Sequence, residues 1–199
     1  SGYVQYIDIE KLQTLADHLK MKVEIRRMPG KYVHRGEPLL RLSGPVEDEA
    51  LATFREAFSL GEARSFDQDL GYGLIVLGEV ASKALSPGIN DPGTAIEVLR
   101  AGTRVLEVLH EDPDPEAEVT YGSVYAPPLD MANLYSVFFS PIARDGAAVI
   151  EVQEALQDCL RAVADFGGDA AAREEARRAR KRAEAVLEAD WEQQVLSGA

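Results

Sequence analysis

The polar residues best placed to do chemistry gather in one short stretch, ALSPGINDPGTA, at residues 84–95. Ser86, Asn90, Asp91 and Thr94 bring hydroxyl, amide and carboxylate groups close together along the chain. If a helix begins just after Asp91, its first backbone N–H groups are free and its N-terminus carries a partial positive charge. Both properties favour an anionic ligand. The stretch is therefore a candidate small-ligand or ion site.

A second polar cluster, RSFDQD at residues 64–69, contributes Arg64, Asp67 and Asp69. Asp67, Asp69 and Asp91 together could serve a hydrolase or a transferase that uses metal ions. About five helical turns separate the two clusters, and a straight helix would hold them at opposite ends. We therefore expect no composite site within one chain, although a neighbouring subunit could unite the clusters.

A purely structural role also explains the unusual residues at 84–95. Pro87 ends the preceding helix, because it cannot continue the backbone hydrogen bonds. Gly88 and Asn90 tolerate backbone angles that other residues avoid. Asp91 followed by Pro92 is a favourable helix start, because Asp caps free N–H groups and Pro lacks one. The stretch is equally explained as a tight corner between two antiparallel helices.

Common catalytic and metal-binding patterns are missing from the sequence. The three histidines, His18, His34 and His110, lie in different segments without ligand spacing, and Cys159 is the only cysteine. There is no phosphate-binding loop, no G-x-G-x-x-G and no G-x-S-x-G pattern. We therefore expect no metal, no cofactor and no catalytic residues.

Charge and hydropathy restrict the class of partner. The chain has 34 acidic and 21 basic residues and a net charge of −13. Such a surface repels the phosphate backbone of nucleic acids, so we expect no nucleic-acid partner. The sequence contains no run of 18 apolar residues, so it predicts no membrane span. Cys159 is expected to be a buried structural thiol, and a chain without disulfides suits a reducing compartment.

The elements that must position the polar residues fall into two parts. Residues 1–45 predict short strands at 3–7, 21–28, 32–33 and 38–42 and one helix at 8–20, from alternating and helical apolar spacing. The part at 46–199 predicts helices, namely 47–60, 69–85, 92–109, 130–140, 146–166 and 169–195, with a solvated acidic loop at 110–118. The predicted fold class is α+β, mainly α, with a small N-terminal β-rich unit packed on an antiparallel helical domain. The two parts are expected to fold as one cooperative unit.

The N-terminal part resembles half of a known small fold. The segment MKVEIRRMPGKYVHRGEPLLRL is similar to the second half of a biotinyl- or lipoyl-type barrel sandwich, whose spacing Gly30, Val33, Gly36 and Leu39 match. In such domains the modified lysine lies in a hairpin. No lysine of this chain is set in that hairpin, so we expect no lipoylation or biotinylation.

The last predicted helix carries a stripe of small residues at alternating spacings of four and three: Ala172, Ala176, Ala179, Ala183 and Val186. Small residues at this spacing let two helices approach closely. The stripe packs either on its own domain or on another chain. With the second possibility in view, we expect a homo-oligomer.

Four segments in this order, SGYVQYID, PGKYVHRGEPL, RSFDQDLGYGLIVLGEVASKALSPGINDPGTA and FFSPIARDGA, resemble an uncharacterised bacterial family of predicted membrane proteins, domain of unknown function 2254. The resemblance covers residues 1–166. It implies a preceding transmembrane region of several helices, which suits a chain that starts at Ser1 rather than Met. It implies no established activity and no site residues.

Two functional hypotheses follow. The first is a soluble, non-enzymatic regulatory or oligomerisation domain of an integral membrane protein in the bacterial inner membrane, on the cytoplasmic side. The second is a small-ligand or ion-binding sensor domain with its site at the corner of residues 86–94.

Overall fold

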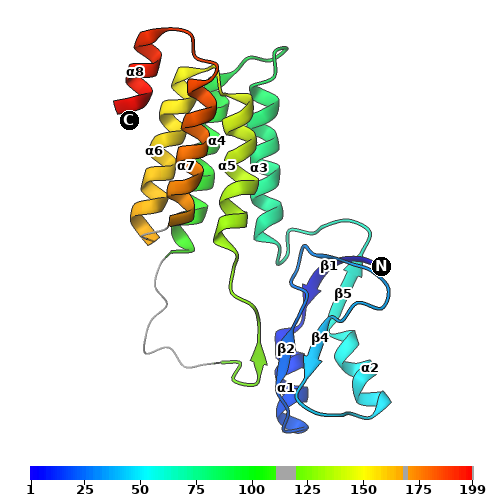
Figure 1. Ribbon diagram of the computed structural model, residues 1–199. Coiled ribbons are helices and arrows are strands. Elements are labelled where there is room, and N and C mark those ends of the chain that lie inside the picture. The colour runs from blue at the N-terminus through cyan, green and yellow to red at the C-terminus, as the bar shows by residue number, and fades with distance from the viewer. Residues whose placement is uncertain (111–119, 168–169, 199) are drawn as a thin grey trace. The chain divides into compact units, whose positions relative to one another are not determined.

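The computed structural model describes residues 1–110, 120–167 and 170–198 (Figure 1). Over these residues the chain is mainly helical with two small sheets, which confirms the predicted α+β, mainly α class. It divides into two compact units. Within the described chain, the β-rich unit comprises residues 1–73 and 120–129, and the helical unit comprises residues 74–110 and 130–198.

Two three-stranded sheets form the β-rich unit. In the first, β1 (Gly2–Ile7) lies between β3 (Tyr32–Val33) and β5 (Phe58–Gly61), both antiparallel to it. In the second, β2 (Val23–Ile25) pairs antiparallel with β4 (Leu40–Leu42) and parallel with β6 (Val124–Tyr125). The described strands form no closed barrel.

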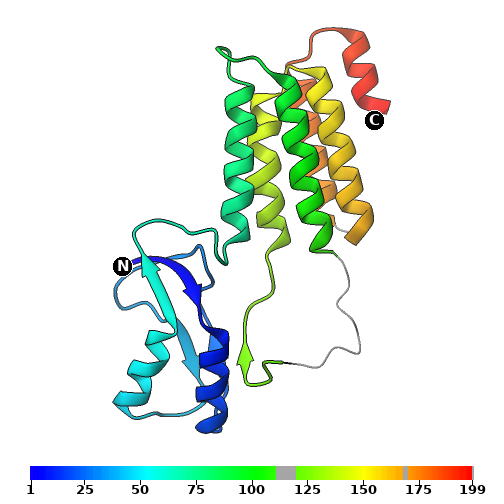
Figure 2. The same cartoon turned by 180° about the vertical axis from the view of Figure 1, so that it is seen from behind.

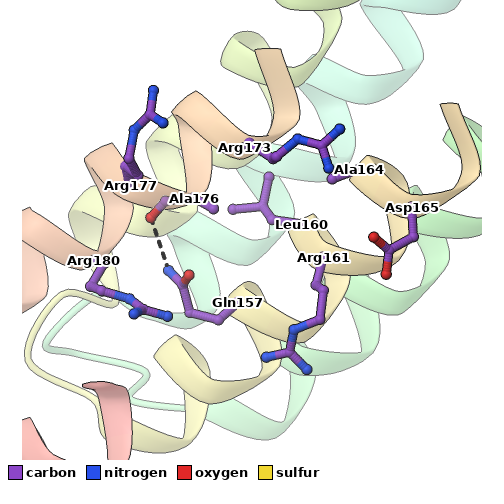
Figure 3. Close-up of a pocket in the computed structure, with 9 residues that line it drawn as sticks. All are labelled: Gln157, Leu160, Arg161, Ala164, Asp165, Arg173, Ala176, Arg177 and Arg180. Atoms are coloured by element: carbon purple, nitrogen blue, oxygen red, sulfur yellow. Dashed lines mark hydrogen bonds between the residues drawn. The ribbon is translucent and has the colours of Figure 1, made fainter. Parts of the chain in front are cut away.

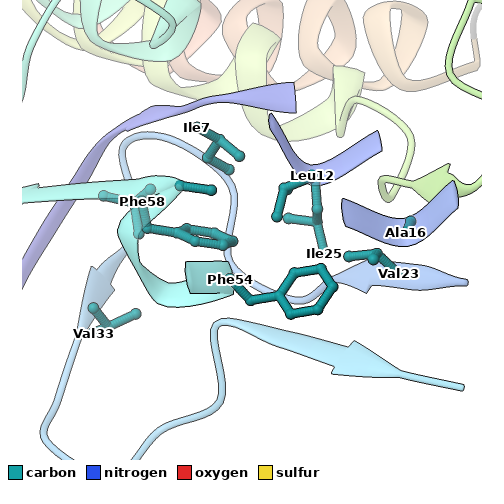
Figure 4. Packing of buried hydrophobic residues seen from close by; sticks show 10 residues of the cluster. Ile7, Leu12, Ala16, Val23, Ile25, Val33, Phe54 and Phe58 are labelled. Atoms are coloured by element: carbon teal, nitrogen blue, oxygen red, sulfur yellow. The ribbon is translucent and has the colours of Figure 1, made fainter. Parts of the chain in front are cut away.

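The core of the β-rich unit lies between these strands and the helices α1 (Ile9–His18) and α2 (Asp48–Glu56). Figure 4 shows its aliphatic and aromatic side chains meeting from both helices and from strands of both sheets. Phe54 of α2 is fully buried at the centre of this view. The buried set is Val4, Ile7, Leu12, Ala16, Val23, Ile25, Val33, Phe54, Ala57 and Phe58.

The helix expected over residues 47–60 is shorter than predicted. α2 ends at Glu56, and the following residues pair with β1 as β5. Residues 58–61 instead form their backbone hydrogen bonds with β1, and Phe58 is buried in the core from this strand. Since β5 belongs to the β-rich unit, the units divide at Gly73 and not at residue 45. Cooperative folding of the two units stays a prediction.

The helical unit is built from long helices lying side by side (Figures 1 and 2). They are α3 (Leu70–Ala84), which enters this unit at Leu74, α4 (Pro92–Val108), α5 (Met131–Asp145), α6 (Ile150–Gly167) and α7 (Ala170–Glu184), followed by the short α8 (Asp190–Gly198). Large buried side chains fill the space between them, among them Leu99, Leu106, Tyr135, Phe138 and Leu156.

Two helix ends differ from the prediction. α5 was expected to end at residue 140 but continues through Pro141 to Asp145, because Ile142 and Ala143 beyond the proline are buried and hold the helix. The helix expected over residues 169–195 breaks into α7 and α8. The turn between them lets Leu187 and Leu196 pack against Ile150 in a small buried core.

The alanine stripe of α7 packs within its own chain. Ala172, Ala179 and Ala183 are at most 2% exposed, and α7 lies against α5 and α6. Ala176 is half-buried and Val186 is exposed. The buried alanines are therefore not a free surface for another chain, and the first of the two alternatives for the stripe holds.

The acidic loop predicted at 110–118 lies, apart from His110, outside the described residues. His110 itself ends the turn that follows α4, where its Nε2 lies 2.6 Å from the hydroxyl of the buried Tyr135. This contact fixes the C-terminal end of α4 against α5.

Candidate functional site

The corner between α3 and α4 is held together by its own polar groups. The Ser86 hydroxyl donates to the Lys83 carbonyl (2.7 Å), and the Asp91 backbone N–H donates to the Ala84 carbonyl (2.8 Å). The Asp91 carboxylate accepts hydrogen bonds from the Thr94 backbone N–H (3.1 Å) and the Thr94 hydroxyl (2.6 Å). The predicted cap of α4 is thus confirmed, with proline directly after it. The hydroxyl and carboxylate groups of the corner serve the turn.

The backbone of the corner also fits the structural explanation. Asn90 takes a positive φ of 50°, which asparagine tolerates better than most residues. The side chain of Asp91 is exposed, and the hydrogen bonds from Thr94 lower the pKa of its carboxyl group. Ser86, Asn90, Asp91 and Thr94 therefore do lie together, but as the parts of a helix–helix turn.

Replacing Asp91 with alanine should lower the stability of the helical unit, because the substitution removes the acceptor that caps α4. The folded-state pKa of Asp91 is depressed, so its stabilisation is fully present above the unfolded value of about 3.9. It is lost as the pH falls through the lower folded value. Urea unfolding should show a difference between parent and variant at pH 7 that shrinks toward pH 2. Asp91→Asn keeps an acceptor and is the control; a variant Asp91→Ala as stable as the parent at pH 7 would contradict the capping role.

The second cluster forms a structural clamp in the β-rich unit. Arg64 and Asp69 make a bidentate ion pair, with 2.6 Å from Nε to Oδ2 and 2.8 Å from Nη2 to Oδ1. Asp69 is 6% exposed and also accepts from the Tyr72 backbone N–H (3.0 Å). The Arg64 guanidinium lies 5.2 Å from the centre of the Tyr72 ring. Hydrogen bonding to Asp69 raises the pKa of Arg64.

Asp67 and Gln68, two other polar residues of this cluster, make separate hydrogen bonds. Asp67 does not join the ion pair; its exposed carboxylate accepts from the Ser65 hydroxyl (2.5 Å). Gln68, which the sequence analysis did not single out, accepts from the Ile7 backbone N–H (2.8 Å) and donates to the Ile7 carbonyl (3.1 Å). These two hydrogen bonds hold the segment against β1. The sequence has no periodic pattern from which this role of Gln68 could be predicted.

The three carboxylates of the hydrolase hypothesis are divided between the two compact units. Asp67 and Asp69 belong to the β-rich unit and Asp91 to the helical unit. Asp69 is engaged by Arg64, and Asp91 by Thr94. Within the described ranges, no three His, Cys, Asp or Glu side chains are grouped so as to hold a metal ion.

The cysteine of the helical unit is buried, as predicted. Burial raises the pKa of the Cys159 thiol, which leaves little thiolate at neutral pH. Because the thiolate is the reactive form, Cys159 is a poor nucleophile.

A groove that the sequence analysis did not identify lies between α6 and α7 (Figure 3). Its volume is about 370 Å³. An aliphatic floor and four guanidinium groups line it, with Asp165 as the single acidic residue: Gln157, Leu160, Arg161, Ala164, Asp165, Arg173, Ala176, Arg177 and Arg180. The sequence shows that Arg173, Arg177 and Arg180 share one helical face. It does not show which residues of α6 lie opposite them.

Comparison with known proteins places these features in a family. The family model for predicted membrane proteins, DUF2254, matches residues 1–162. Uncharacterised proteins of Mycobacterium bovis and Mycobacterium tuberculosis are each 30% identical over 175 residues, which cover 82% of this chain and 33% of theirs. The chain thus spans about a third of the length of these relatives. No solved structure matches the chain significantly. In the described part of the chain, no helix has the length and apolar character needed to span a membrane. The match over residues 1–162 shows that the chain belongs to the DUF2254 family of predicted membrane proteins.

Proposed function

We propose that this chain is a soluble, non-enzymatic module of a bacterial membrane protein and that it regulates the membrane part by self-association. The family description supports attachment to a membrane protein. The polar clusters at residues 64–69 and 86–94 serve structural bonds, which argues against an enzyme or a sensor at the corner. The single observation that carries self-association is the exposed face of α3, where Val80 lies between Glu79 and Lys83.

The exposed face of α3 carries one apolar residue beside two charged residues. Its only charged residues are Glu79 and Lys83. Leu74, Gly78 and Ala81 face the interior of the helical unit and are buried. On the opposite side, residues 76, 79, 80 and 83 share one face because they follow the helical spacing of three and four. Val80 on this face is 45% exposed.

The occupant that this face fits is a second copy of the same chain. Two α3 helices crossing antiparallel about a two-fold axis near Val80 would place Glu79 of each copy beside Lys83 of the other. Both charges are exposed and have the opposite signs that such a symmetric contact requires. A single helix face is smaller than the about 800 Å² per partner of a standard interface. The dimer is therefore weak in isolation and is strengthened by tethering to a membrane, which raises the local concentration.

Sedimentation of the chain over a range of concentrations tests this proposal. The parent should dimerise, and Val80→Glu should remain monomeric because it places a charge in the contact. Val186→Glu is the matched control, since Val186 is equally exposed at 46% but lies after α7. Glu79→Lys should weaken the dimer, and adding Lys83→Glu should restore it. A parent that stays monomeric at its highest attainable concentration, or an equal loss in Val186→Glu, would overturn the proposal.

We further propose that the parent protein lies in the bacterial inner membrane with this module on the cytoplasmic side. The disulfide-free sequence supports a reducing compartment. Fusing alkaline phosphatase or a fluorescent protein to the C-terminus of the full-length parent tests the side. Fluorescence without phosphatase activity is expected, and the reverse pattern would place the module outside.

A further inference from the structure

The groove between α6 and α7 concentrates positive charge in a chain whose net charge is −13. Four arginines and one aspartate line it. We infer that this groove binds a phosphate-bearing anion, an inference independent of self-association through α3.

The groove follows from the helical spacing of its two walls. On α7, Arg173, Arg177 and Arg180 recur at intervals of four and three residues, so they lie on one face at successive turns, about 5 Å apart along the axis. On α6, Leu160 and Ala164 are buried and form the floor. The half-buried Ala176 has only a methyl group, which leaves room between the helices.

Two of the arginines are directed across the groove. Figure 3 shows Arg173 reaching from α7 toward Ala164, and Arg180 reaching from α7 toward Gln157, on either side of Leu160. The Gln157 side chain is buried and donates to the Ala176 carbonyl (3.2 Å), which fixes the floor between the two arginines. An anion above Leu160 would lie between two guanidinium groups.

Ion pairs hold two of the arginines that line the groove. Arg161 bonds to Asp158 (3.2 Å), and Arg177 is paired with Glu174. Arg173 makes no ion pair with any residue that the structure describes. Because their side chains are directed across the groove, we assign Arg173 and Arg180 to the ligand.

Phosphate suits this arrangement better than a single carboxylate. A guanidinium offers planar paired N–H donors that match two phosphate oxygens, and two such groups along one groove accommodate more than one negative charge. The aliphatic floor gives an apolar surface to the part of the ligand beyond its phosphates. The phosphate could belong to a soluble molecule or to a lipid headgroup, because both present the same oxygens.

Isothermal titration of the 199-residue chain with inorganic pyrophosphate, and sedimentation with phosphatidylglycerol vesicles, test the assignment and separate the two sources. We expect binding to at least one probe, weaker at higher salt, and none to phosphatidylcholine vesicles. The double variant Arg173→Gln/Arg180→Gln should weaken binding at least tenfold. The matched control is Arg178→Gln/Arg182→Gln, which removes the same charge from α7 outside the groove and should keep the parent affinity.

The outcomes are decisive in either direction. Pyrophosphate binding identifies a soluble phosphate ligand, and binding to phosphatidylglycerol alone identifies a lipid headgroup. Arg173→Lys/Arg180→Lys keeps the charge and should restore only part of the affinity if paired guanidinium donors matter. Binding to neither probe, or equal weakening in the control, would overturn the inference. Helical circular dichroism of each variant shows that lost binding does not arise from lost folding.

Discussion

Replacing Gly102 with alanine should destabilise the helical unit by about 2–3 kcal/mol, near the upper end for an overpacked core. A Cβ atom at this position of α4 would lie 2.1 Å from Cζ of the Phe138 ring. The ring has no space to retreat, since Phe138 is fully buried and its centre is 4.7 Å from that of Phe139. The two helices must therefore move apart or the ring must leave its rotamer, and both cost free energy.

Urea unfolding followed by circular dichroism at 222 nm measures this effect. Gly73→Ala is the matched control, because Gly73 is also helical but an added Cβ meets nothing within 4 Å. That variant should be as stable as the parent or more stable. Combining Gly102→Ala with Phe138→Leu should recover part of the loss. If Gly102→Ala alone matches the parent, the close approach of α4 to Phe138 is wrong.

Replacing Asp69 with alanine should destabilise the β-rich unit by about 2–4 kcal/mol. Removing one partner of a buried ion pair costs about 3–5 kcal/mol, and the 24% exposure of the Arg64 side chain reduces that figure. The same substitution removes the side-chain acceptor of the Tyr72 N–H at the start of α3, and the backbone carbonyl of residue 69 remains as its other acceptor. The Asp69 carboxylate is also closely packed against Gly30, because a Cβ atom added at Gly30 would lie 2.3 Å from Asp69 Oδ2.

Hydrogen exchange of the β1 amides reports the stability of this unit directly. Asp67→Ala is the matched control: Asp67 is exposed two residues away, and its loss should change stability by about 0.5 kcal/mol or less. Asp69→Asn should fall between parent and Asp69→Ala, since it keeps an acceptor without the charge. Equal exchange rates in Asp67→Ala and Asp69→Ala would show that the ion pair does not hold the unit together.

Features determined by near neighbours in the chain were predictable from the sequence. The start of α4 is an example, because Asp91 and Thr94 are three residues apart and the cap needs no other part of the fold. Features that depend on distant pairing were not. The local pattern predicts helix at β5, because the register of Phe58 opposite Ile7 cannot be seen in it. The helix through Pro141 was missed for the same reason, since burial overrides the local effect of proline.

The candidate sites show the same division. The sequence identified Arg64 and Asp69 as a polar cluster, but their close pairing makes them a clamp. It identified the alanine stripe, but only packing shows that α5 and α6 cover most of it. The groove between α6 and α7 needed the relative register of two helices, which apolar periodicity does not give. The sequence alone therefore does not mark Arg173 and Arg180 as residues of one site.

The hydrogen bonds of Gln68 bear on aggregation as well as on folding. β3 pairs only with Gly2 and Tyr3 of β1, so no strand of the described residues lies beside the far end of this edge. An open edge presents N–H and C=O groups to which a strand of another molecule can add. Gln68 occupies both groups of Ile7 with one amide and so closes the edge without a strand. The Gln68 side chain thus blocks this edge of β1 from the intermolecular strand pairing from which cross-β aggregates grow.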